Sequence, residues 1–432
     1  MTKATLFSTL LLTSCVIDGS DDSQCVGGKC DGYVEEDLEI ASDLPTECKG
    51  ADVIRIERPS TADGSDTFQY GFRFKAPITA GAPVLVYLPG GPGQSSMDHP
   101  AEFIPEGWGY LMTDPRGVGC NRLAQLPSAV NSGRFFSTRE IANDAIAAIQ
   151  DRKLDHYILF GISYGTLLGT TVAHEIEARG VAKPDAVVLE GVLGKTFGHD
   201  DTNFPGSEYI NQWQRMRPAL PADVLTELDT KAAPYGFDAT AWSKILMGFL
   251  PRGPLETFNY VSALSSTQPE ATRQEVLATF KQIVDSPATP AGAVELYRQV
   301  ACREIMDTVP ANDLDVVFQA GQLVRNSAQE GTKCGELHVT TPYDSASLQF
   351  SMKLYEFIGD SDTATPPWQG AYHFEHHTSA AVRVTTKYGG HNSLELNQAA
   401  CAPQLMASIA AGGADLATVA AACPMQTVID SK

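Results

Sequence analysis

Ser163 is the residue whose neighbours point most directly to nucleophilic chemistry. It lies in the pattern Gly-x-Ser-x-Gly at 161–165, after the apolar run 157–160 and before the helix-compatible segment 167–173. This order of strand, tight turn and helix is the context of a nucleophile elbow, which exposes the serine hydroxyl. The N–H of Tyr164 would then face an oxyanion that develops on the substrate. A chance occurrence of two common residue types is the alternative, and the flanking pattern disfavours it.

A serine hydroxyl is a weak nucleophile unless a base takes its proton and a third group orients that base. His391 is the candidate base because it follows the strand-like run 381–384 in a loop with two glycines. Asp362 is the candidate acid in the loop after the strand-like run 353–358, and Asp360 is its rival two residues earlier. The order serine, acid, histidine, each on a loop after a later strand, agrees with this assignment.

A second group of titratable residues could bind a metal ion through its helical spacing. It consists of His373, Glu375, His376 and His377. Such a cluster is more often a solvated helix face, and the cysteines do not form the tight clusters with histidine that a zinc site needs. The sequence therefore predicts an enzyme with no metal and no cofactor.

The elements that position these residues alternate between strand and helix. Over residues 84–194 this alternation predicts a parallel sheet with helices on both faces. The run 84–88 is wholly apolar, as expected for a central strand, and leads into the glycine-rich segment 89–96, which presents bare N–H groups. Residues 53–56 and 68–74 alternate as half-buried strands do, and we expect them to form an antiparallel pair.

The chain of 432 residues is long enough for one large domain with an insertion. The insertion has several helix-compatible segments separated by prolines, and we expect it to cap the carboxyl ends of the strands. By composition the chain divides into an export signal (1–14), an acidic flexible spacer (15–47), the first part of the sheet domain (48–194), the helical cap (195–349) and the second part of the sheet domain with carboxyl-terminal helices over 397–429 (350–432).

The first residues have the pattern of an export signal. Lys3 precedes the apolar segment 6–12, which is too short to span a bilayer. Leu12-Thr-Ser-Cys15 resembles the lipobox of bacterial lipoproteins, so we expect cleavage before Cys15 and a lipid on its thiol. An ordinary secretory signal with an incidental Cys15 is the alternative. The protein is expected to be exported and held in the cell envelope, in the periplasm or on the outer surface.

The charge of the chain limits its possible partners, and its cysteine content indicates disulfides. The net charge of −21 argues against nucleic acid as a partner and against electrostatic attachment to anionic lipid. An even number of further cysteines in an exported chain indicates disulfides. Proximity suggests Cys25 with Cys30 and Cys401 with Cys423, and elimination then leaves Cys48 with Cys120 and Cys302 with Cys334.

Six motifs in this order resemble the α/β-hydrolases of the proline iminopeptidase and tripeptidyl aminopeptidase family, from about residue 48 to the carboxyl end. They are LPGGPG (88–93), DPRGVG (114–119), GISYGT (161–166), LEGV (189–192), GDSDTATP (359–366) and GH (390–391). The resemblance implies an α/β-hydrolase fold, a mostly parallel central sheet with a helical cap insertion. It implies Ser163 as nucleophile, Asp362 and His391 as its partners, and the amides of Gly91 and Tyr164 as the oxyanion hole.

The resemblance also implies a peptide substrate with a free amino terminus. Family members bind the substrate ammonium with acidic residues near the cap, since a buried charge must be paired. Glu304 and Glu190 are the candidates here, and a surface ion pair is the alternative for each.

Two residues depart from the pattern of the family. Pro89 stands where the iminopeptidases have a histidine, and Glu190 replaces the aspartate frequent in the tripeptidyl branch. The pair Cys401 and Cys423 is similar to one in the secreted tripeptidyl enzymes.

These observations favour an exported, lipid-anchored serine aminopeptidase that acts through an acyl-enzyme. An esterase or another small-molecule hydrolase with the same triad is the alternative, because fold and triad do not determine the acyl group. A non-catalytic surface protein is disfavoured by the complete set of serine, aspartate and histidine.

Overall fold

The computed structural model describes residues 25–26, 29–30, 36–61, 66–96, 103–197, 205–287, 289–306, 316–325, 334 and 337–432. The expected export signal, Cys15 and most of the expected spacer lie outside the described residues.

The main sheet has nine strands in the order β13-β12-β11-β8-β7-β5-β6-β4-β3. The six from β12 to β6 are mutually parallel, whereas β13 and the β4–β3 pair are antiparallel edges. This confirms the mostly parallel sheet and the antiparallel pair at its start. The bounds are β3 Val53–Pro59, β4 Thr67–Lys75, β5 Val84–Leu88, β6 Gly109–Thr113, β7 Tyr157–Ile162, β8 Ala186–Glu190, β11 Leu354–Gly359, β12 Ala381–Thr386 and β13 Thr427–Ser431.

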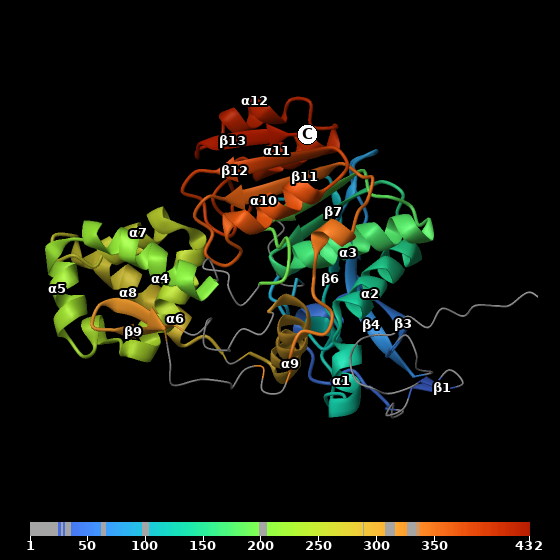
Figure 1. The fold of residues 1–432 in the computed structure, drawn as a ribbon, viewed down its shortest axis with the longest axis horizontal. Helices are drawn as coiled ribbons and strands as arrows, with labels where there is room; N and C mark the ends of the chain where they lie inside the picture. The colour runs from blue at the N-terminus through green and yellow to red at the C-terminus, as the bar shows by residue number, and fades with distance from the viewer. Residues whose placement is uncertain are drawn as a thin grey trace, which may run out of the picture.

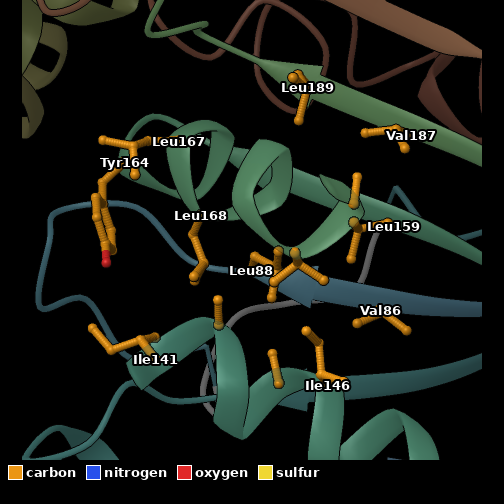
Figure 2. Close-up of a cluster of buried hydrophobic side chains, with 14 of the residues drawn as sticks. Val86, Leu88, Ile141, Ile146, Leu159, Tyr164, Leu167, Leu168, Val187 and Leu189 are labelled. Atoms are coloured by element: carbon orange, nitrogen blue, oxygen red, sulfur yellow. The ribbon is translucent and has the colours of Figure 1, made fainter. Parts of the chain in front are cut away.

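Both faces of the central strands are buried, because side chains alternate between two hydrophobic cores. Val86 and Leu159 pack under α2 (Thr138–Asp151) and α3 (Tyr164–Arg179), as Figure 2 shows. Phe160 faces the other core. That second core is covered by α11 (Ala402–Ala410) and α12 (Leu416–Ala421). The first face also holds α10 (Pro367–His376), and α1 (Ala129–Phe135) precedes α2.

An insertion between β8 and β11 forms a lobe beside the sheet domain (Figure 1). Its own core includes Trp213, Trp242, Phe249 and Phe280. Helix α9 lies apart from this lobe, next to α1. The domain boundaries of the cap, residues 195 and 349, remain predictions from the sequence. The helices are α4 Pro205–Met216, α5 Ala222–Thr230, α6 Ala239–Phe249, α7 Pro254–Ser262, α8 Glu270–Val284 and α9 Ala291–Val300.

The cap is not wholly helical, which corrects the sequence-based expectation. β9 (Val316–Gln319) and β10 (Gln322–Arg325) form an antiparallel hairpin. Ala320 and Gly321, which connect them, both have positive φ, the geometry that suits a tight hairpin turn. The indole ring of Trp242 stacks on Phe318 at 5.4 Å between centroids, and this contact fixes the hairpin to the helical core of the lobe.

The carboxyl end also departs from the expectation of helix over 397–429. Residues 427–431 form β13, the antiparallel edge strand beside β12, in register from Thr427 opposite Thr386 to Ser431 opposite Val382. The β-branched residues at 427–429 favour a strand, and the alanine-rich composition before them concealed this change.

The structure contains three of the four disulfides expected from the sequence: Cys48–Cys120, Cys302–Cys334 and Cys401–Cys423. Cys25 lies opposite Cys30 in a two-stranded ladder of β1 (Cys25–Val26) and β2 (Lys29–Cys30), but their side chains are outside the described part. Among the residues described, every helix is too short or too polar to cross a bilayer.

Candidate active site

Ser163 occupies a strained turn between β7 and α3. Its φ of 56° and ψ of −124° lie outside the regions that non-glycine residues favour. Its N–H donates a hydrogen bond to the carbonyl oxygen of Glu190, 2.8 Å away, at the end of the neighbouring strand β8. A Cβ on Gly161 would lie 2.1 Å from the oxygen of Gly165, and one on Gly165 would lie 2.1 Å from the oxygen of Leu88. Both positions therefore require glycine, because another backbone segment lies where a Cβ would be.

The loops after β11 and β12 bring Asp362 and His391 together. Because these strands are parallel neighbours, their carboxyl ends lie at the same edge of the sheet. Nδ1 of His391 lies 2.8 Å from Oδ2 of Asp362, a carboxylate that is almost fully buried. With the Nδ1 proton donated to Asp362, Nε2 carries the lone pair that a general base needs. The predicted pairing of this acid with this histidine is thus present in the structure.

The imidazole of His391 also lies beside the serine turn. A Cβ placed on Gly191 would be 2.7 Å from Cε1 of His391. Gly191 directly follows Glu190, whose carbonyl oxygen accepts from the N–H of Ser163. The three candidate residues are therefore gathered at the carboxyl ends of β7, β11 and β12, around the end of β8.

Asp360, the rival acid, has a different role. It is exposed, and its Oδ1 accepts hydrogen bonds from the N–H of Tyr388 at 2.7 Å and the hydroxyl of Ser361 at 2.9 Å. The bond from Tyr388 joins the acid loop to the start of the histidine loop. Asp360 therefore links the two loops by a hydrogen bond.

Thr365 is a site residue that the sequence reasoning missed. Its hydroxyl donates to Oδ2 of Asp362 at 2.6 Å and lies 3.0 Å from Nδ1 of His391. Oδ1 of Asp362 accepts from the N–H groups of Ala364 and Thr365, at 2.8 and 2.9 Å. The loop thus fixes the orientation of the carboxylate, and the carboxylate in turn fixes the orientation of the imidazole. The signal for it in the sequence was the Asp-x-x-Thr-Pro pattern at 362–366, which places a threonine three residues after this aspartate.

The glycine-rich loop after β5 lies against Ser163. A Cβ on Gly90 would be 3.0 Å from Cβ of Ser163, and Gly91 has a φ of +111°. Asp114 anchors the far end of the loop, since its carboxylate accepts from the N–H of Ser96 at 2.7 Å and the hydroxyl of Ser95 at 3.0 Å. This arrangement is compatible with the predicted use of the Gly91 N–H, next to that of Tyr164 at the start of α3, as an oxyanion donor.

Glu190 does not face a substrate site, which corrects one of the two expectations for ammonium binding. Its side chain is 0% exposed, and Oε1 accepts from the N–H groups of Leu394 and Glu395, at 2.5 and 3.0 Å. Burial and the neighbouring Glu395 raise the pKa of Glu190 well above its usual value. The residue holds the chain just after His391 and acts as a positioning residue for that loop.

Glu304 is linked through Thr138 to the residue that follows the nucleophile. It is 9% exposed within the π-helical turn η6 (Ala301–Ile305), and its Oε1 accepts from the N–H of Thr138 at 3.0 Å. The hydroxyl of Thr138 is 3.1 Å from that of Tyr164, the residue after the nucleophile. Burial, and after it the charge of Glu304, raises the pKa of Tyr164 well above its usual value. Thr138 therefore connects this carboxylate to the side chain of the residue that follows the nucleophile.

The cluster at the end of α10 is divided, since His373 and His377 are buried whereas Glu375 and His376 are exposed, so the expectation of a solvated face is wrong for His373 and His377. Its Nδ1 is 2.6 Å from Oε1 of the buried Glu356, and its Nε2 is 3.1 Å from the hydroxyl of Thr170. Burial lowers the pKa of His377 to about 4. Within the part of the chain that the structure describes, no group of histidine, cysteine, aspartate and glutamate has an arrangement that could hold a metal ion.

Comparison with known proteins agrees with this architecture. Residues 83–226 match the family model described as alpha/beta hydrolase fold, a segment that contains Ser163 and the glycine-rich loop. The protein has the alpha/beta-hydrolase fold, with a large, mostly parallel sheet and flanking helices. No curated protein matches the chain.

Similar solved structures are distant in sequence. VinJ is 15% identical with a TM-score of 0.43, and the match covers 83% of this chain and 98% of that chain. A proline iminopeptidase from Mycobacterium smegmatis is 14% identical with a TM-score of 0.43, covering 84% and 100%. The haloalkane dehalogenase DbeA from Bradyrhizobium elkani USDA94 is 15% identical with a TM-score of 0.42, covering 84% and 98%.

The two aspartates of the acid loop can be separated by mutation. Asp362→Asn removes the negative charge beside Nδ1 and presents an amide there that favours the wrong tautomer of His391, and we expect the rate of labelling by a fluorophosphonate probe to fall by at least about 100-fold. Asp360→Asn changes only an exposed link between the two loops and is expected to keep the rate within about threefold. A larger loss in Asp360→Asn than in Asp362→Asn would reverse the assignment.

Proposed function

We propose that the protein is a serine hydrolase with Ser163 as nucleophile, His391 as general base and Asp362 as the acid that orients it. In more detail, we propose an exported aminopeptidase that releases residues or short peptides from a free amino terminus. The observation that carries the first statement is the Asp362–His391 hydrogen bond of 2.8 Å, formed beside the strained turn of Ser163.

The proposed reaction follows from this placement. His391 accepts the hydroxyl proton as Oγ of Ser163 attacks the substrate carbonyl carbon. The N–H groups of Tyr164 and Gly91 stabilise the resulting oxyanion, and His391 returns the proton to the leaving amine. Water, activated by the same imidazole, then hydrolyses the acyl-enzyme. The carboxylate of Asp362 stabilises the imidazolium formed in both steps.

Two features support action at a chain end. The insertion covers the glycine-rich loop, since a Cβ on Gly93 would lie 2.8 Å from the carbonyl oxygen of Ala293 in α9. Because α9 lies this close to the glycine-rich loop, the site favours a short or terminal segment of a peptide substrate over the middle of a folded chain. Glu304 supplies a nearly buried carboxylate near Tyr164, and a substrate ammonium entering a closed site needs such a partner.

The reaction class and the need for a free amine are tested together. We expect turnover of short peptides carrying a carboxyl-terminal chromogenic amide, and we expect Ser163→Ala to reduce kcat by at least about 10⁴-fold. Acetylation of the substrate amino group is expected to lower kcat/KM by at least about 50-fold, since Glu304 would lose its charged partner. Equal turnover of free and acetylated substrates would identify an esterase or another hydrolase.

The contribution of Glu304 is measured against that of Glu190. Glu304→Gln keeps an acceptor for the N–H of Thr138 and loses the negative charge. We expect it to lower kcat/KM for free-amine substrates by about 10- to 100-fold, mainly through KM, and to spare acetylated esters. Glu190→Gln is the matched change at a carboxyl that holds the His391 loop, and it should keep the preference for the free amine. Loss of that preference in Glu190→Gln alone would make Glu190 the ammonium-binding residue.

We also propose that Cys15 carries a lipid that anchors the mature protein in the cell envelope. The lipobox-like Leu12-Thr-Ser-Cys15 and the acidic segment after it support this. In a bacterial host, wild type is expected to incorporate a fatty-acid label and to fractionate with membranes. Cys15→Ser is expected to lose both properties, because no thiol remains for lipidation. A labelled Cys15→Ser protein, or an unlabelled wild type, would contradict the anchor.

A further inference from the structure

The loop that carries His391 is hydrogen-bonded to the cap as well as to the sheet domain. The N–H of His391 donates to the carbonyl oxygen of Pro251 at 2.5 Å, and Nδ2 of Asn397 donates to that of Arg252 at 3.1 Å. Oδ1 of Asn397 also accepts from the N–H of Gly390 at 2.7 Å. Resting on the serine-hydrolase function proposed above, we propose that Asn397 is a positioning residue that couples the docked cap to the placement of the general base.

The cap side of this contact is a turn fixed within the hydrophobic core of the lobe. Residues Leu250–Arg252 form the short helix η5, and Leu250 is fully buried in that core. The carbonyl oxygen of Leu250 accepts from Nε2 of Gln212 on α4 at 2.9 Å. The hydroxyl of Thr257 on α7 donates to the carbonyl oxygens of Phe249 and Gly253, on either side of the turn. The two carbonyl groups that meet the His391 loop are therefore fixed to the core of the lobe.

The two segments approach so closely that side chains are excluded between them. A Cβ on Gly390 would lie 2.1 Å from the carbonyl oxygen of Pro251 and 2.4 Å from the backbone N of Gly253. Gly253 has a φ of +110°, and a Cβ there would be 2.9 Å from the carbonyl oxygen of Tyr388. The contact thus depends on a residue without a Cβ on each side. Two surfaces that merely pack against each other have no such requirement.

Asn397 bridges the two segments because its amide has both a donor and an acceptor. The acceptor holds the peptide just before His391, and the donor holds the cap. The opposite side of the loop is held by Asp362 at the imidazole and by Glu190 at residues 394 and 395. Loss of the cap contact leaves those bonds but releases the Gly390–His391 peptide, and a small displacement of the imidazole strongly slows proton transfer.

Two substitutions separate the halves of this bridge. Asn397→Asp keeps the acceptor for the N–H of Gly390 and loses the donor to Arg252. Asn397→Leu loses both and keeps a similar volume. Asn259→Asp is the control, since Asn259 is exposed on α7 of the same lobe. Each variant is measured with a free-amine chromogenic peptide, and kcat is calculated per active site titrated with a fluorophosphonate, so that misfolded protein is not counted.

We expect kcat to fall about 10-fold in Asn397→Asp and further in Asn397→Leu, with KM within about twofold of wild type. Asn259→Asp is expected to match wild type. Gly390→Ala, which displaces the turn at Pro251 by steric contact, is expected to lower kcat in the same way. A purely structural role would lower the unfolding temperature while kcat per titrated site stayed at the wild-type value, and that result would overturn the proposal. Failure of the serine-hydrolase function itself would be distinct, since wild type would then neither titrate nor turn over.

Discussion

The close approach of three backbone segments is the constraint on which the candidate active site depends. β7 can end in a sharp turn only because Gly161 and Gly165 leave their backbones free to pass within contact of each other and of Leu88 on β5. This packing holds Ser163 in a conformation that a serine does not adopt freely, and its N–H is then fixed by the carbonyl oxygen of Glu190. The strands on either side of β7, β5 and β8, are fully buried.

Glu190 links the nucleophile to the base in two ways. Its main chain holds the serine turn, and its side chain holds the segment that follows His391. Asp362, itself oriented by Thr365, then fixes the ring of His391. The cap meets the same loop from its other side at Pro251 and Arg252. Ser163 and His391 are therefore each held by segments far apart in the sequence, and Asp362 by its own loop, as preorganised charge stabilisation requires.

The residues that the sequence could identify are those whose signal is local. A continuous apolar run followed by Gly-x-Ser-x-Gly predicts its own turn, and a strand followed by an aspartate or histidine loop predicts its place at the sheet edge. Glu190 and Asn397 contact partners more than a hundred residues away in sequence, at 394 and 252, and nothing in their sequence neighbourhood indicates these contacts. β13 was missed for a different reason, since its short β-branched run comes soon after an alanine-rich helical segment.

The central claim is that Ser163, His391 and Asp362 form one catalytic unit with the amides of Tyr164 and Gly91. A crystal structure of the protein after reaction with a fluorophosphonate tests it most directly, since the phosphonyl oxygen occupies the place of the oxyanion. We expect phosphorus bonded to Oγ of Ser163 and an oxygen within hydrogen-bonding distance of both amides. An adduct on another residue, or an oxygen directed away from both amides, would contradict it.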